Sequence, residues 1–158
     1  MQATLDAPNA YLYTDALGQG AYGTPFVDCE CALDSPFVMV YGHHMSDGTV
    51  FADFAKFADR DYAKEHEVIY VYTRSGNERH ELEAKAVDVV NANRETLRTS
   101  FSTDEERVAY LNGSIAKSDL VLGGDALTGE KIWAFATCSY QTSNSRTVVY
   151  ASAPQSTS

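Results

Sequence analysis

The sequence predicts a mainly β protein, a closed or partly closed β-barrel with short helices at its periphery. Three observations support this fold class. Short apolar runs of strand length recur along the 158 residues, turn-forming residues separate them, and only two segments have helical periodicity. There is no internal repeat, low-complexity block or glycine-rich phosphate-binding motif.

The composition indicates one globular domain and disfavours some partners. Hydrophobic residues make up 44% and charged residues 22%, and the chain is long enough for a substantial core. The net charge of −10 argues against binding to nucleic acid or to an anionic membrane, because both require a basic surface. No apolar run reaches the 18 residues of a membrane span. We expect one domain over residues 1–153 and a disordered polar tail over 154–158.

The first half of the chain should begin as a loop and continue into strands. Residues 1–23 are punctuated by glycines and have no strand pattern. Alternation predicts a strand over 24–33, a continuous apolar run predicts a buried central strand over 37–41, and helical spacing predicts a short helix over 50–58. Cys29 and Cys31 would share one face of the first strand, where a disulfide between them is unfavourable, so we interpret them as small, partly buried thiols.

The second half is predicted to hold most of the sheet. Apolar patterns favour strands over 68–72, 81–90, 120–122, 131–138 and 146–150, although the 81–90 pattern could also suit a helix. Ser102 and Thr103, followed three residues later by Glu105 and Glu106, form a capping-box pattern that predicts a helix running to about residue 118.

Three reactive side chains stand at predicted strand ends. Cys138 closes the 131–138 run, and Arg146 opens the next run after a polar turn, which puts a thiol and a guanidinium side by side at one end of a sheet. His43 follows the 37–41 run through Gly42. A thiol that attacks, an imidazole that moves protons and a cation that stabilises an oxyanion are the parts of acyl transfer through a thioester.

Plainer interpretations exist for each residue. A lone Cys is more often a structural thiol, and a His or Arg at a strand end is often a solvated group. His43 and His44 point to opposite faces of an extended backbone, so only one can face Cys138 and the pair cannot easily share a metal ion. A papain-like protease has its Cys before its His, which is the reverse of the order here. A metal-binding module, for which the spacings match no strong zinc pattern, and a non-catalytic barrel remain as alternatives.

The same residues carry a family resemblance. Thr137-Cys138 ahead of Arg146 resembles the Thr-Cys…Arg signature of sortases. The segment Tyr41 to Phe51 is similar to the Tyr-Gly-His-Asn-Met-x-Asp-Gly-x-x-Phe segment of class B sortases, and residues 101–118 also resemble that class. The match runs from about residue 11 to 151. Two departures are His44 in place of Asn, and Ala-Phe at 134–135 in place of Thr-Leu.

The resemblance implies a cysteine transpeptidase on the extracellular face of a Gram-positive membrane. Cys138 would be the nucleophile, His43 the acid–base group and Arg146 the oxyanion ligand, with no metal or organic cofactor. The substrate would contact the residues around the nucleophile, which are Ala136, Thr137, Ser139 and Tyr140. The implied partners are surface proteins with a sorting signal and an amino acceptor, either a peptidoglycan precursor or a pilin in a pilus-building member.

The resemblance also implies that the leading helix and first strand of the class B domain are absent from this sequence. Met1-Gln2 would correspond to the end of that first strand, and the residues that follow have no signal-anchor pattern. A barrel that lacks a strand has an open edge, so we expect self-association through that edge or reduced stability.

Overall fold

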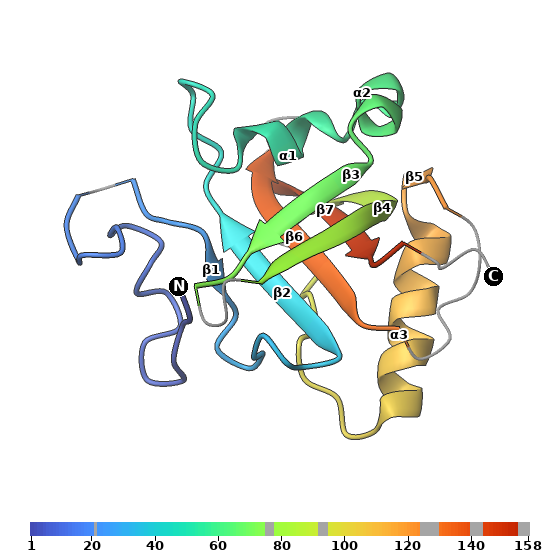
Figure 1. Ribbon diagram of the computed structural model, residues 1–158, viewed down its shortest axis with the longest axis horizontal. Helices are drawn as coiled ribbons and strands as arrows, with labels where there is room; N and C mark the ends of the chain where they lie inside the picture. The colour runs from blue at the N-terminus through green and yellow to red at the C-terminus, as the bar shows by residue number, and fades with distance from the viewer. Residues whose placement is uncertain (21, 75–77, 92–94, 124–129, 140–143, 155–158) are drawn as a thin grey trace.

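The computed structural model describes residues 1–20, 22–74, 78–91, 95–123, 130–139 and 144–154, with the backbone alone for Cys138 and Ser139. A seven-stranded sheet runs in the order β1-β2-β6-β7-β4-β3, with β5 paired to β4, and it curls into part of a barrel (Figure 1). The β2–β6 pair is parallel and the others are antiparallel. The strands are β1 (Phe26–Val27), β2 (Phe37–Gly42), β3 (Val68–Tyr72), β4 (Arg79–Asn91), β5 (Leu120–Val121), β6 (Ile132–Ser139) and β7 (Ser145–Ser152).

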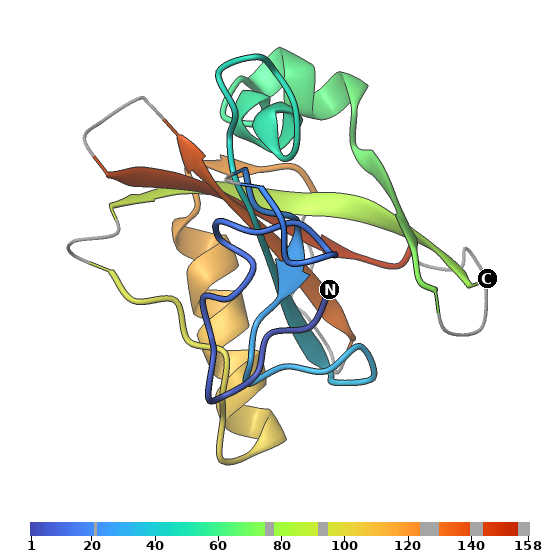
Figure 2. The same ribbon diagram turned by 90° about the vertical axis from the view of Figure 1, so that its left-hand side faces the viewer.

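Helices cover both faces of the central strands. The helix α3 (Asp104–Lys117) lies on one side of the sheet, and α1 (Ala52–Lys56) with α2 (Arg60–Glu65) lies on the other (Figure 2). Phe54 of α1 stacks on Phe135 of β6, with ring centroids 4.8 Å apart. Because both faces are covered, β6 and β7 are buried along most of their length, as their nearly continuous apolar runs require.

The capping box predicted for α3 is present. The Thr103 hydroxyl accepts a hydrogen bond from the Glu106 amide at 3.1 Å, and the Glu106 carboxylate accepts one from the Ser102 amide at 2.9 Å. The buried Arg107 donates to the Asp104 carboxylate at 2.8 Å and to two carbonyls that precede β2 and β6. This guanidinium therefore ties α3 to the start of the two parallel strands.

The predicted fold class is confirmed, with two corrections to its elements. Residues 24–33 do not form one strand, because β1 ends at Val27 and the chain then turns. The Asp28 carboxylate accepts a hydrogen bond from the Glu30 amide at 2.8 Å, and the Asp28 carbonyl accepts one from Cys31 at 3.1 Å. The second correction is α2, which was not predicted from the sequence.

The N-terminal segment is irregular but tied to the sheet. Residues 1–20, 22 and 23 form no helix or strand, as predicted, although Gln2 bridges Val27 in a parallel sense. The Val27 amide donates to the Met1 carbonyl at 2.9 Å, and the Ala3 amide donates to the Val27 carbonyl at 3.0 Å. Within the described ranges, no helix has the length and apolar character needed to cross a membrane.

Candidate active site

The hairpin formed by β6 and β7 places the predicted nucleophile beside the predicted cation. The two strands pair antiparallel along their full length, and Cys138 is the direct partner of Arg146 in this register. Their adjacency at one end of the sheet, expected from the two apolar runs and the polar turn, is therefore present in the backbone.

A pocket of about 200 Å³ brings His43 and Arg146 together. His43 reaches it from the end of β2, and Arg146 from the start of β7. The parallel pairing of β2 with β6 aligns Gly42 with Thr137, so the residue after β2 lies level with the end of β6. The other residues that line the pocket are Pro8, Asn9, Leu12, Phe26, Asp28, Tyr41, Gly42, Ala136 and Thr137.

His43 is held in place from two sides. Its carbonyl accepts a hydrogen bond from the Phe51 amide at 2.8 Å. A Cβ on the preceding residue, Gly42, would lie 2.4 Å from the Phe51 ring, so this approach requires glycine. The imidazole Nε2 is hydrogen-bonded to the Leu12 carbonyl, and the Tyr13 ring lies 5.9 Å from the imidazole.

The two adjacent histidines have different surroundings, as strand alternation predicts. His44 pairs with Val50 in an isolated bridge and lines a separate pocket together with Met45 and Ala52. Only His43 lies in the pocket that also contains Arg146.

Arg146 brings a positive charge to this pocket. In the part of the chain that the structure describes, no carboxylate lies within ion-pair distance of its guanidinium. Its position in the pocket fits the binding of a carbonyl or developing oxyanion, since a guanidinium presents a fixed fork of donors.

Sequence reasoning missed Asp28 and Tyr41 as pocket residues. Burial is the main cause that raises the pKa of the Tyr41 hydroxyl. The negative charge of Asp28 and a hydrogen bond to Asp28 raise this pKa further, whereas the positive charge of Arg146 lowers it. Asp28 thus brings a carboxylate into the same pocket as Arg146. Tyr41 precedes Gly42-His43 directly, which was a usable signal, whereas nothing local marks Asp28.

The other two thiols are poor candidates for a nucleophile. Burial is the main cause that raises the pKa of the Cys31 thiol to about 11, and the pKa of Cys29 is raised as well. A thiol with a raised pKa is mostly protonated at neutral pH and reacts slowly. Both lie in the turn after β1, not on a strand with a shared face, and neither lines the pocket of His43.

Two of the four predicted substrate contacts can be placed. Ala136 and Thr137 line the pocket with His43 and Arg146. The side chain of Ser139 and all of Tyr140 lie outside the described residues. Within the described ranges, there is no group of three or more His, Cys, Asp or Glu side chains that could hold a metal ion.

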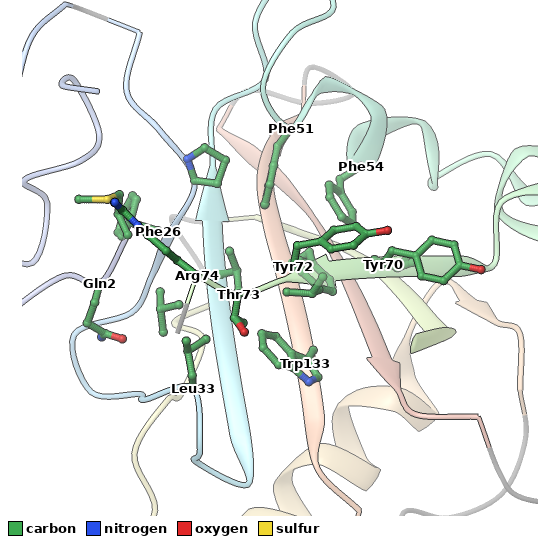
Figure 3. A pocket seen from close by; sticks show the side chains of 17 residues that line it. Gln2, Phe26, Leu33, Phe51, Phe54, Tyr70, Tyr72, Thr73, Arg74 and Trp133 are labelled. Carbon is green, nitrogen blue, oxygen red and sulfur yellow. The ribbon is translucent and has the colours of Figure 1, made fainter. Parts of the chain in front are cut away.

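A larger pocket, of about 770 Å³, lies elsewhere on the molecule and is mostly apolar. Figure 3 shows Tyr70 and Tyr72 of β3 and Trp133 of β6 around it, with Gln2 and Phe26 on its other side. Neither His43 nor Arg146 is among the residues that line it. We therefore place the candidate active site in the smaller pocket, because that pocket contains His43 and Arg146 although it is not the larger one.

Comparison with known proteins supports the resemblance seen in the sequence. No family model and no curated protein matches the chain. The sortase B structure of Clostridium perfringens matches 98% of this chain and 86% of its own, at a TM-score of 0.85 and 26% identity. A Bacillus anthracis protein described as similar to sortase B has a TM-score of 0.81 and 27% sequence identity. The match covers 96% of this chain and 69% of that protein. A Staphylococcus aureus sortase B in a substrate complex shares the fold, with a TM-score of 0.79 and 22% sequence identity. The match covers 96% of this chain and 71% of that protein.

The chain therefore has the fold of a sortase. More closely, its structural neighbours are class B sortases, so the predicted resemblance is confirmed.

Proposed function

We propose that this protein is a cysteine transpeptidase of the class B sortase type, with Cys138, His43 and Arg146 as its catalytic residues. The observation that carries the proposal is the placement of the three residues at one end of the sheet, which for Cys138 rests on the backbone. Cys138 is paired with Arg146 across β6 and β7, and Arg146 shares a pocket with His43. The raised pKa values of Cys29 and Cys31 add support, because they make these two thiols poor nucleophiles.

The proposed reaction has two acyl-transfer steps. The Cys138 thiolate attacks a peptide carbonyl, and the Arg146 guanidinium stabilises the tetrahedral oxyanion. His43, as imidazolium, donates a proton to the leaving amine as the C–N bond breaks, which leaves a thioester on Cys138. An incoming amine then attacks the thioester carbonyl, His43 takes up the proton that this amine loses, and Cys138 departs as thiolate.

The substrate would be a sorting signal cleaved after Thr, of the Asn-Pro-Gln-Thr-Asn or Leu-Pro-x-Thr-Gly type. The residues proposed to contact it are Ala136, Thr137, Ser139 and Tyr140. The acceptor would be the amino group of a peptidoglycan precursor or of a pilin lysine, and the reaction would take place outside the cell membrane. Among the structural neighbours, one sortase B is complexed with triglycine and another with its substrate, which fits ligands of these classes.

A peptide panel tests the proposal. The protein is incubated with peptides of both sorting types, with triglycine, a lysine-bearing pilin peptide or no amine, and the products are read by mass spectrometry. We expect cleavage after Thr and a new amide bond to one amine. Cleavage at other bonds, or none with any peptide while the protein remains folded, would contradict the proposal. Arg146→Lys keeps the charge but loses the fork of donors, and it should lower kcat/KM by about 10²-fold or more.

A further inference from the structure

We propose that the N-terminal segment positions the catalytic histidine. In this account the Leu12 carbonyl holds the proton of His43 on Nε2, and Nδ1 is the nitrogen that exchanges protons during the reaction. The catalytic part of this inference rests on the proposed function, whereas the tautomer itself does not.

The tautomer follows from the hydrogen bond. Nε2 of His43 is bonded to the Leu12 carbonyl, and a carbonyl oxygen can only accept. Nε2 must therefore carry a hydrogen, and in the neutral imidazole Nδ1 then has the free lone pair. Within the described ranges Nδ1 has no hydrogen-bond partner of its own, which leaves it available to a reacting group.

The carbonyl belongs to a loop that is fastened on both sides. The Leu12 amide donates to the Asn9 carbonyl at 3.1 Å, and the Thr24 amide donates to the Tyr11 carbonyl, also at 3.1 Å. The Tyr11 ring lies 6.1 Å from the ring of Phe26 in β1. These contacts present the Leu12 carbonyl from a defined position beside the pocket, which this loop also lines.

Gly23 is the residue on which this position depends. Its φ of +68° lies in the left-handed region, and a Cβ there would stand 2.4 Å from the Leu12 oxygen and 2.7 Å from the Tyr11 oxygen. The oxygen that accepts from His43 is therefore the one that alanine at position 23 would displace. Gly20 has a similar φ of +83° and nothing within 4 Å of its would-be Cβ, which makes it a matched control.

The consequence for catalysis concerns one proton. When His43 protonates the leaving amine, the proton moves from Nδ1 to the amine nitrogen, while Nε2–H remains bonded to Leu12. The ring then has the tautomer that can accept the next proton at Nδ1 without turning over. If Leu12 is displaced, the two neutral tautomers mix and the ring is less well oriented.

The test compares Gly23→Ala with Gly20→Ala. Both variants place alanine at a left-handed glycine position, but only the first reaches the Leu12 carbonyl. In protein labelled with ¹⁵N-histidine, with His43 assigned through His43→Gln, the ring nitrogens of neutral His43 should show the Nε2–H tautomer in wild type and in Gly20→Ala. Gly23→Ala should show a mixture, with kcat for peptide cleavage lower by about 10- to 100-fold and KM changed much less.

Two results would overturn the inference. One is a wild-type spectrum with the proton on Nδ1, which needs no variant and so decides even if Gly23→Ala fails to fold. The other is a folded Gly23→Ala that matches Gly20→Ala in both spectrum and kcat. If the spectra are as expected but wild type cleaves no peptide, the positioning by Leu12 stands and the proposed function fails.

Discussion

At the scale of single residues, the adjacent histidines give a direct test of which side chain does the chemistry. We expect His43→Ala to lower the rate of peptide cleavage by about 10²–10⁴-fold, the usual contribution of general acid–base catalysis. His44→Ala should have a much smaller effect, because His44 lines a different pocket. Steady-state kinetics on both variants checks this, and the reverse ranking would show that the site has been assigned to the wrong histidine.

A second residue-scale prediction concerns stability. Thr137 and Thr147 face each other across β6 and β7, and both hydroxyls are buried without a hydrogen-bond partner among the described residues. Burying an unpaired hydroxyl costs free energy, so replacing Thr147 by the similarly shaped Val should stabilise the fold by about 1 kcal/mol.

Thermal unfolding of Thr147→Val measures this, and a gain of roughly 2–4 °C corresponds to that free energy at this chain length. Thr147→Ser, which keeps the hydroxyl and loses the methyl, is the matched control and should be destabilised. A Val variant that melts below wild type would mean that the hydroxyl has a partner in solution.

At the scale of the elements, the edge where β4 meets β5 contains a carboxyl with altered acidity. Burial, and then the nearby charges of Asp119 and Glu95, raises the pKa of Asp88 to about 6, and a hydrogen bond to Asp119 adds to this. An unfolded Asp titrates near pH 3.9. The folded state therefore holds more protons between about pH 4 and 6, and the free energy of unfolding falls as pH rises through that window.

Asp88→Asn should remove the loss of stability that ionisation of Asp88 causes above about pH 6. We expect the variant to be more stable than wild type at pH 7 but not at pH 4. The gain at pH 7 should be about 1 kcal/mol, because solvent screens this partly exposed site. Urea unfolding at the two pH values measures the difference, with the exposed Asp6→Asn as control. An equal gain at both pH values would contradict the assigned cause.

Some elements could be predicted from the sequence because their signals are local. The strand 68–72 has the predicted bounds, and α3 begins at its capping box. The error over 24–33 arose because alternation alone resembles a strand, while the Asp28 turn that ends β1 competes with it. The helix α2 has few apolar residues, and the Asp59 side chain that caps it was its main signal.

The site was predictable only in part, for a physical reason. Cys138, His43 and Arg146 are side chains whose chemistry and strand-end positions are visible in the sequence. Asp28 enters the pocket through the β1–β2 pairing, and the Leu12 contribution is a backbone carbonyl, which has no sequence signature. Both depend on how distant segments close over the sheet.

At the scale of the whole molecule, the part of the curled sheet that the structure describes is uncovered at β3. β1 is bordered by Met1–Ala3, but β3 pairs only with β4 among the described residues. Tyr70 and Tyr72 of β3 are 48% and 73% exposed, and the apolar pocket of Figure 3 lies beside this strand. An exposed apolar edge strand invites pairing with another chain, so we propose concentration-dependent self-association through β3.

A lysine on the edge should suppress that association. Tyr72→Lys places a charge on β3, and Tyr22→Lys places the same charge on an equally accessible loop residue, 67% exposed in wild type. Light scattering over a concentration series should show a lower mean mass for Tyr72→Lys alone. A monomeric wild type, or equal effects of the two variants, would rule out the edge as the interface.

The central claim is that Cys138 forms a thioester with a sorting-signal peptide, and intact-protein mass spectrometry after rapid acid quench tests it most directly. In the absence of an amine acceptor, we predict a mass increase equal to the acyl fragment ending in Thr. Peptide mapping should place it on Cys138, hydroxylamine should remove it, and Cys138→Ala should lack it while Cys29→Ala and Cys31→Ala retain it. An adduct on Cys29 or Cys31, or full cleavage by Cys138→Ala, would contradict the account.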